Sequence, residues 1–167
     1  MSVDRKAPIY SLPDALHGLL IYGVGDGVAA WLTGQFQLSR LLGIMVIGST
    51  VYAMEIPHYF RWIDRQSPAR PGWRASVPRT LLALLYFNPL WIARHLLFIR
   101  CFSGQWEAVS TDLLRLGASA FLANIPFAFL ANYLIQNQLP SDWRFPSSAV
   151  FSALMAIYYA SSEVLFG

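Results

Sequence analysis

The residues of this sequence that could do chemistry are charged side chains inside long apolar stretches. Asp26 lies in the run Gly23-Val-Gly-Asp-Gly-Val28, and Arg94 and His95 are adjacent in a later stretch. An unpaired charge at the centre of a bilayer costs at least ~2.5 kcal/mol on insertion scales, so it needs a partner or a water-filled cavity. We therefore expect Asp26 to contact Arg94 or His95 inside a helix bundle.

Two interpretations of this polar set are open. Intramembrane charges mark pathways for solutes or protons, but they also form buried structural pairs. Glu55, one helical turn before His58, and Asn124 extend the polar set toward the inner half of the bundle. We take Asp26, Arg94, His95, Glu55 and Asn124 as the residues of a polar pathway or of a buried charge pair.

The elements that position these residues are apolar helices. Of 167 residues, 56% are hydrophobic and 13% charged, whereas a soluble domain averages ~25% charged residues. An ordinary soluble domain is therefore excluded. A helix needs about 20 apolar residues to cross the hydrocarbon, and five segments approach this length: Leu12–Thr33, Ser39–Trp62, Val77–Cys101, Asp112–Gln136 and Phe145–Phe166. The sequence predicts an all-α membrane bundle of about five transmembrane helices, with residues 1–167 as one integral membrane domain.

Basic residues are distributed unequally between the two sets of connections, which predicts the orientation. One side carries eight: Arg5, Lys6, Arg61, Arg65, Arg70, Arg74, Arg79 and Arg144. The other carries three: Arg40, Arg100 and Arg115. This places the N-terminus inside. The single Lys and the short N-terminus favour a bacterial inner membrane over a mitochondrial one. We expect Arg61, Arg65, Arg70 and Arg74 to bind anionic lipid headgroups rather than nucleic acid.

The second and fourth segments align at an offset of 69 residues. The alignment superposes Gly48 on Gly117, Ile56 on Ile125, Pro57 on Pro126 and Phe60 on Phe129. This pattern predicts either a parallel two-helix repeat plus one helix or simply two similar helices bent at Pro57 and Pro126. Gly23 and Gly27 form a small-xxx-small face, which lets another helix approach closely.

Several classes of site are not indicated. The one cysteine, Cys101, cannot form an intramolecular disulfide or a cysteine metal cluster. No nucleophile–base set or zinc-protease spacing is present, and the glycines lie inside an apolar segment rather than in a phosphate-binding loop. We therefore expect no enzyme, no metal site and no cofactor. A bis-histidine haem on His17 and His58 is an alternative that visible absorbance would test.

The sequence also resembles a known family. The residues are Gly25-Asp26, Arg40, His58-Tyr-Phe-Arg-Trp-Ile-Asp64, Pro126, Asn132-Tyr133, Pro140-Ser-Asp-Trp-Arg144 and Tyr158. They are similar to motifs of the twenty-two-kilodalton peroxisomal membrane protein family and its mitochondrial inner-membrane relatives. This chain departs from that pattern at Ile125, where the family has Trp, and at Ala83-Leu84, where it has Asp-Gln. The resemblance implies a small multi-span protein, and some members of the family behave as channels.

A weaker resemblance is to the bacterial alanine exporter family, through Arg40-Leu41, Pro57 to Arg61 and Phe87-Asn-Pro89. That family has four spans, which leaves Phe145–Phe166 unexplained. Both resemblances imply solute movement, so the first hypothesis is a channel or transporter for a small polar solute or ion. The alternative is a non-catalytic accessory subunit of a respiratory or photosynthetic membrane complex. The expected partners are the lipid bilayer, further copies of this chain or other membrane subunits.

Overall fold

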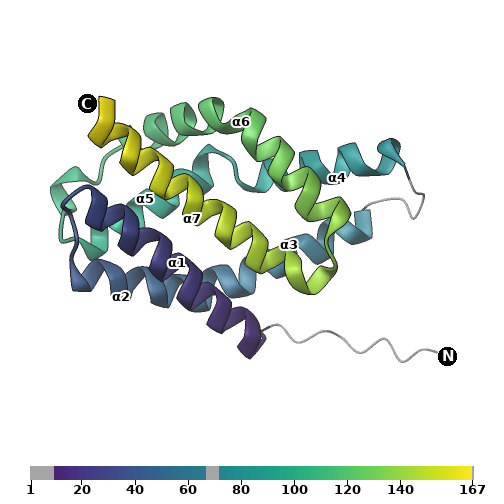
Figure 1. The fold of residues 1–167 in the computed structure, drawn as a ribbon, viewed down its shortest axis with the longest axis horizontal. Coiled ribbons are helices and arrows are strands. Elements are labelled where there is room, and N and C mark those ends of the chain that lie inside the picture. Colours follow the sequence, from purple (N-terminus) through teal and green to yellow (C-terminus); the bar gives the residue numbers. More distant parts are fainter. Residues whose placement is uncertain (1–9, 67–71, 167) are drawn as a thin grey trace.

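The structure is a computed structural model that describes residues 10–66 and 72–166, with no description of the side chains of residues 73 and 158–166. All regular elements in these ranges are helices (Figure 1). They are α1 (Leu12–Leu32), α2 (Leu38–Ile47), η1 (Gly48–Tyr52), α3 (Ala53–Gln66), α4 (Trp73–Tyr86), α5 (Pro89–Phe102), η2 (Trp106–Ala108), α6 (Asp112–Gln138) and α7 (Ser141–Phe166). The predicted all-α bundle is confirmed.

Four helical segments are long and apolar enough to cross a membrane. They are Leu12–Leu32, Leu38–Gln66, Arg74–Phe102 and Asp112–Gln138. Each contains one of the first four expected segments or agrees with it to within a few residues. The fifth expected segment, Phe145–Phe166, lies within α7. Since α7 has 26 residues and a helix rises ~1.5 Å per residue, its backbone is also long enough to span the hydrocarbon.

The third expected segment is not one continuous helix. It is divided into α4 and α5 at Asn88, whose backbone is extended (ψ 175°). Pro89 lacks an amide hydrogen and disfavours helical geometry in the residue before it, which explains the break. The Asn88 side chain caps α5 by accepting hydrogen bonds from the backbone N–H groups of Leu90 and Trp91, at 2.8 and 3.1 Å. The predicted segment Val77–Cys101 thus lies in one stretch long and apolar enough to cross a membrane, but its helix is interrupted at Asn88.

The second segment contains a different irregularity. Between α2 and α3, residues Gly48–Tyr52 form a π-helical stretch. Such insertions are rare in helices and often occur at functional sites. Pro57 follows in α3, and Pro126 lies within α6. Both prolines are thus inside helices, as the sequence predicts.

The helices pack in two neighbouring groups. In Figure 1, α7 lies alongside α1, and these two helices share the most extensive packing in the molecule. Helix α6 packs on α4 and α5, and α1 packs on α2 and η1. The core between the groups contains Tyr22, Ile44, Tyr52, Ile56 and Phe60. This core fixes the rotation of α3 and α5, and therefore the direction of their polar side chains.

Glycines allow neighbouring helices to approach α1 closely, and Gly23, one of the two chosen from the sequence, is among them. A Cβ atom on Gly18 would overlap the carbonyl oxygen of Gly48 in η1, and one on Gly25 would overlap Ala153 of α7. A Cβ on Gly23 would lie 2.5 Å from Met45 Cγ of α2, whereas one on Gly27 would lie 3.4 Å from Leu41 Cδ1, an ordinary contact. Close packing on α1 therefore involves Gly18 and Gly25 as well as Gly23.

The glycines of the possible repeat occupy similar places. A Cβ on Gly117 of α6 would lie 2.5 Å from the backbone oxygen of Pro89, the first residue of α5. Gly48 likewise meets the backbone oxygen of Gly18 in α1. In both cases the second helix of a pair contacts the backbone of the first through its glycine. The two helices differ in that α6 is continuous, whereas the other is interrupted by η1.

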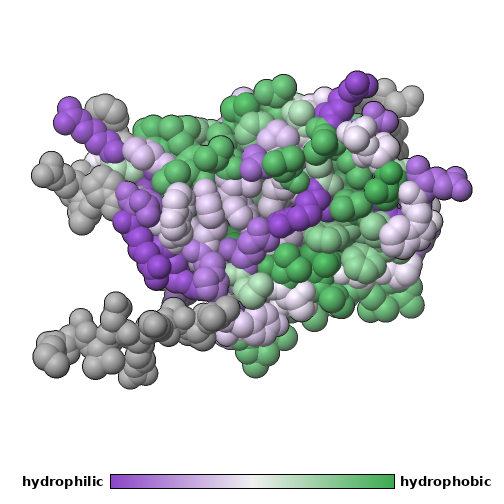
Figure 2. All heavy atoms as spheres, turned by 180° about the vertical axis from the view of Figure 1, so that it is seen from behind, coloured by the Kyte–Doolittle hydropathy of each residue, from purple (hydrophilic) through white to green (hydrophobic). Residues whose placement is uncertain are grey.

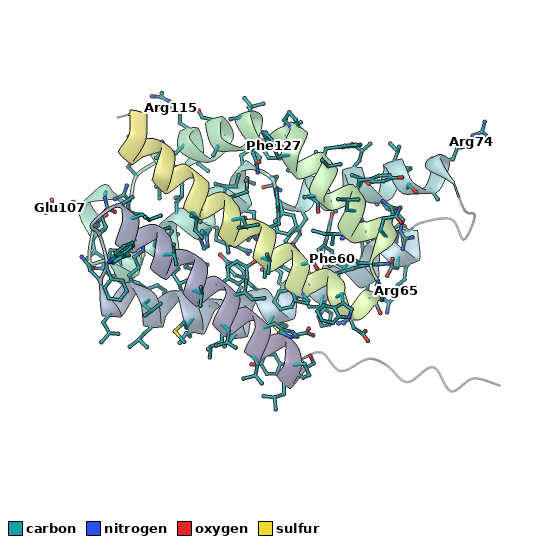
Figure 3. The ribbon with its side chains drawn as sticks, viewed as in Figure 1. Phe60, Arg65, Arg74, Glu107, Arg115 and Phe127 are labelled. Atoms are coloured by element: carbon teal, nitrogen blue, oxygen red, sulfur yellow. The ribbon has the colours of Figure 1, made fainter. Side chains whose placement is uncertain are left out.

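The two ends of the bundle carry different polar groups. Arg65 and Arg74 lie at one end and Glu107 and Arg115 lie toward the other (Figure 3). At the first end, Asp64 of α3 accepts hydrogen bonds from Arg79 of α4 and from Arg144 of α7; Arg144 Nη1 lies 2.7 and 2.8 Å from the two carboxylate oxygens. This cluster joins three helices at the arginine-rich end. Arg70, one of the expected headgroup residues, lies outside the described residues.

Candidate functional site

Asp26 is buried in an ion pair, but its partner is Arg40 rather than Arg94 or His95. Arg40 Nε lies 2.8 Å from Asp26 Oδ2, and Arg40 Nη2 lies 2.5 Å from Oδ1. This is the bidentate geometry in which two N–H groups of a guanidinium donate to the two oxygens of a carboxylate. Asp26 and Arg40 are only 5% and 7% exposed. The predicted Asp26–Arg94/His95 contact was therefore wrong.

The reason is the short turn between α1 and α2. Arg40 was expected in a connection, but α2 begins at Leu38, so Arg40 lies in its first turn. Asp26 is six residues before the end of α1. The hairpin returns Arg40 to the level of Asp26, and a long arginine side chain can reach the carboxylate. This pair closes one end of the α1–α2 hairpin and leaves neither residue available to line a pathway.

Arg94 of α5 pairs with Glu55 of α3. Arg94 Nη1 is 3.0 Å from Glu55 Oε1, and Nη2 is 2.9 Å from Oε2. In contrast to the Asp26–Arg40 pair, these side chains are 33% and 34% exposed. Both residues can be selected from the sequence, but their pairing cannot, because 39 residues separate them. Among the ion pairs of the described helices, this is the one whose two residues both lie in the middle part of a segment long enough to span a membrane.

Aromatic residues surround this pair on its inner side. The guanidinium carbon of Arg94 lies 5.7 Å from the centre of the Tyr52 ring, within range of a cation–π contact. The Tyr52 hydroxyl is 2.9 Å from His95 Nδ1, and His95 is stacked on Trp91 with ring centres 5.7 Å apart. His95 is thus held by Tyr52 rather than by Asp26. The π-helical stretch contributes Tyr52 to this arrangement.

Glu55 and Arg94 lie in a groove on the side of the bundle. Two adjoining hollows, of ≈ 600 and ≈ 410 Å³, share Glu55, Tyr59 and Tyr86 as lining residues. The larger is also lined by Val51, Met54 and His58, and the smaller by Leu85, Asn88, Leu90, Trp91 and Arg94. The groove therefore lies where α3 meets the break between α4 and α5. We call it the lateral groove.

The polar face of α3 connects the lateral groove to the arginine-rich end. Glu55, His58, Arg61 and Arg65 are spaced three or four residues apart, so they lie on one side of the helix. Ile56, Phe60 and Ile63 are buried on the opposite side. Figure 2, which views the molecule from behind, shows a hydrophilic band that runs from one end of this face to its middle, between apolar regions. The polar groups thus follow the outside of the bundle rather than its axis.

Of the remaining predicted residues, His58 lines the lateral groove, whereas no contact in the described part of the chain connects Asn124 or His17 to it. The side-chain oxygen of Asn124 has no hydrogen-bond partner there, so it is not connected to Glu55 or Arg94. His58 lines the lateral groove, and its Nδ1 is 2.7 Å from the carbonyl oxygen of Met54. His17 lies on α1. Within the described residues, no group of three or more His, Cys, Asp or Glu side chains could hold a metal ion.

Comparison with known proteins finds no match. No protein-family description, curated protein or solved structure is significantly similar to this chain. The site is therefore interpreted from its own geometry.

Proposed function

We propose that this protein is a membrane transporter or channel that moves a small polar solute or ion, with the lateral groove as its binding site. The observation that carries this proposal is the Glu55–Arg94 pair, which is about one-third exposed within two membrane-spanning segments. Intramembrane charges are costly and mark substrate pathways more often than charges elsewhere. Asp26 and Arg40, in contrast, satisfy each other in a closed pair and serve the fold.

The break between α4 and α5 supports the same proposal. Discontinuous helices at mid-membrane form the binding sites of many transporters, because irregular backbone is tolerated there only where it is covered by protein or lines a polar cavity. In this chain the break at Asn88 lies in the wall of the lateral groove, next to Arg94. The polar face of α3 offers a route to the groove from the arginine-rich end.

The test is solute flux through purified protein in vesicles. Swelling of proteoliposomes in glycerol, urea and potassium chloride is followed by light scattering and compared with protein-free vesicles. We expect wild-type protein to accelerate swelling in at least one of these solutes. Glu55→Gln and Arg94→Gln should slow it about tenfold or more, since losing a hydrogen bond to a charged group costs roughly 1.5–3 kcal/mol.

Glu107→Gln is the matched control. It removes the same charge from an exposed residue of η2, distant from the groove in sequence and fold, and should leave flux unchanged. Equal flux in wild type and in both groove variants would contradict a role for the pair.

The second candidate function is an accessory subunit, and one observation favours it. The lateral groove opens on the outside of the bundle, where a helix of a neighbouring protein could also reach the Glu55–Arg94 pair. Native electrophoresis after mild detergent extraction, with mass spectrometry of the band, separates the two functions. Stoichiometric foreign subunits would support the accessory role, and a monomer or homo-oligomer would support transport.

The placement in the cell and the relationship to known families are also proposals. The basic residues favour a bacterial inner membrane with the N-terminus inside and the arginine-rich end facing anionic headgroups.

The hydrogen bonds between Arg144 and Asp64 bring together two motifs through which the chain resembles the peroxisomal membrane protein family. This contact gives both motifs a common structural role and supports the resemblance. We propose that the protein is not an enzyme.

A further inference from the structure

We propose that the lateral groove binds the headgroup of a zwitterionic phospholipid, whose acyl chains stay in the bilayer, and that the protein moves this lipid between leaflets. The inference rests on the proposed transport function with the lateral groove as its binding site, and it names a phospholipid as the transported molecule in place of a small free solute. It comes from three properties of the groove: its opening on the side of the bundle, its adjacent opposite charges, and its aromatic walls.

The opening of the groove suits a lipid better than a free solute. The groove lies on the outer surface of α3, α4 and α5, and exposed apolar side chains such as Met54, Leu85 and Leu90 line it beside Glu55 and Arg94. A free solute bound there would have acyl chains on one side. A phospholipid is both polar and apolar, so its headgroup could occupy the groove while its chains contact the apolar rim.

The charges of the groove complement a zwitterionic headgroup. The planar guanidinium of Arg94 is suited to bind a phosphate, and the carboxylate of Glu55 is suited to bind an ammonium group. Arg94 Nε and Trp91 Nε1 are two buried N–H donors without a hydrogen-bond partner in the described part of the chain. Both residues line the smaller hollow, so a phosphate bound there would reach these donors once the two side chains turn toward it.

The aromatic walls add to recognition of the ammonium group. Tyr59 and Tyr86 line both hollows beside Glu55, with their ring centres 4.5 Å apart. Aromatic faces attract quaternary ammonium groups such as choline. A headgroup with its phosphate on Arg94 and its ammonium on Glu55 would place the ammonium next to these rings.

The hydrophilic band provides the route by which a headgroup reaches the groove. His58, Arg61 and Arg65 follow Glu55 along one side of α3 toward the arginine-rich end. Basic residues attract lipid phosphates at a membrane surface. A headgroup can therefore leave the surface at Arg65 and remain next to polar side chains as far as the Glu55–Arg94 pair.

The experiment measures lipid movement in proteoliposomes of phosphatidylcholine. The probe is phosphatidylcholine with a nitrobenzoxadiazole label on one acyl chain, which leaves the headgroup intact, and dithionite bleaches the label in the outer leaflet. We expect wild-type protein to bring the inner-leaflet label to the outside, so that bleaching proceeds well beyond half of the signal. Phosphatidylglycerol labelled in the same way should move more slowly, since it has no ammonium group for Glu55.

Glu55→Gln and Arg94→Gln should slow phosphatidylcholine movement about tenfold, as expected for the loss of a charged contact. Trp91→Phe keeps an aromatic ring and the packing but removes the N–H donor, and it should slow movement about threefold, the effect of one neutral hydrogen bond. Glu107→Gln should equal wild type. Each variant is compared only as a monodisperse preparation that melts at the wild-type temperature.

The outcomes separate this inference from the proposed function. Solute flux without lipid movement would overturn the lipid inference and leave the transport proposal standing. Absence of both would overturn both. Lipid movement that is equal in wild type and in all three groove variants would overturn the assignment to the groove.

Discussion

Asp26→Asn should lower the melting temperature of the detergent-solubilised protein by on the order of 10 °C. The substitution keeps the size of the side chain but removes the charge that neutralises Arg40. Arg40 is 7% exposed and makes both of its short contacts with Asp26. Removing one partner of a buried pair typically costs 3–5 kcal/mol, because the other charge stays buried without compensation. Thermal unfolding followed by size-exclusion fluorescence measures the change.

The double variant Asp26→Asn/Arg40→Gln tests the physical reason. If the cost of the single variant comes from an uncompensated Arg40, then removing that charge as well should recover a large part of the lost stability. Glu107→Gln, which removes an exposed acidic charge, should melt like wild type. Equal melting temperatures for the single and double variants would show that the charge of Arg40 is not the source of the instability.

Gly18→Ala should have the second large effect, a loss of stability where helix propensity alone predicts a gain. In an exposed helix interior, alanine is more favourable than glycine by about 1 kcal/mol. Here the added Cβ would overlap the backbone oxygen of Gly48, and backbone atoms cannot move aside as a flexible side chain can. Overpacking costs typically 1–3 kcal/mol, and an overlap with backbone should lie near the upper end of this range. Less the propensity gain of about 1 kcal/mol, we expect a net loss of about 2 kcal/mol in the free energy of unfolding. Unfolding in a denaturing detergent titration measures this loss.

Gly27→Ala provides a matched control in the same helix. Its Cβ would lie 3.4 Å from Leu41 Cδ1, an ordinary contact, so this variant should keep or slightly raise the stability. Gly48→Ala approaches the same crossing from the other side and should resemble Gly18→Ala, since its Cβ would overlap the backbone oxygen of Gly18. The prediction fails if Gly18→Ala and Gly27→Ala change stability in the same direction.

The helices could be predicted from the sequence because their main determinants are local. The thickness of the hydrocarbon fixes the length of an apolar segment, and Ser11 and Thr33 border α1 where the apolar run begins and ends. The break in the third segment also had a local signal, Asn88-Pro89, which favours an extended residue before the proline. Apolar composition predicts the span as a whole, and this dipeptide accounts for the interruption within it.

The selection of Glu55 and Arg94 was possible for a similar reason. An ionisable residue in an apolar segment is costly wherever its helix lies, so residue type and position alone identify it as needing a partner. The partner itself depends on tertiary structure. Arg94 bonds Glu55 because α3 and α5 present these side chains to each other, and Asp26 bonds Arg40 because a short turn returns α2 to α1.

Residue type and order thus suffice to predict an all-helical chain with segments long and apolar enough to cross a membrane and with charges that need partners. The packing of the helices settles which charges pair, which glycines lie at helix crossings, and that the exposed pair faces the side of the bundle. The physical reason is that segment length and burial cost are properties of one helix and its solvent. Pairing depends instead on the rotation, tilt and depth of two helices, which the packing of the whole core determines.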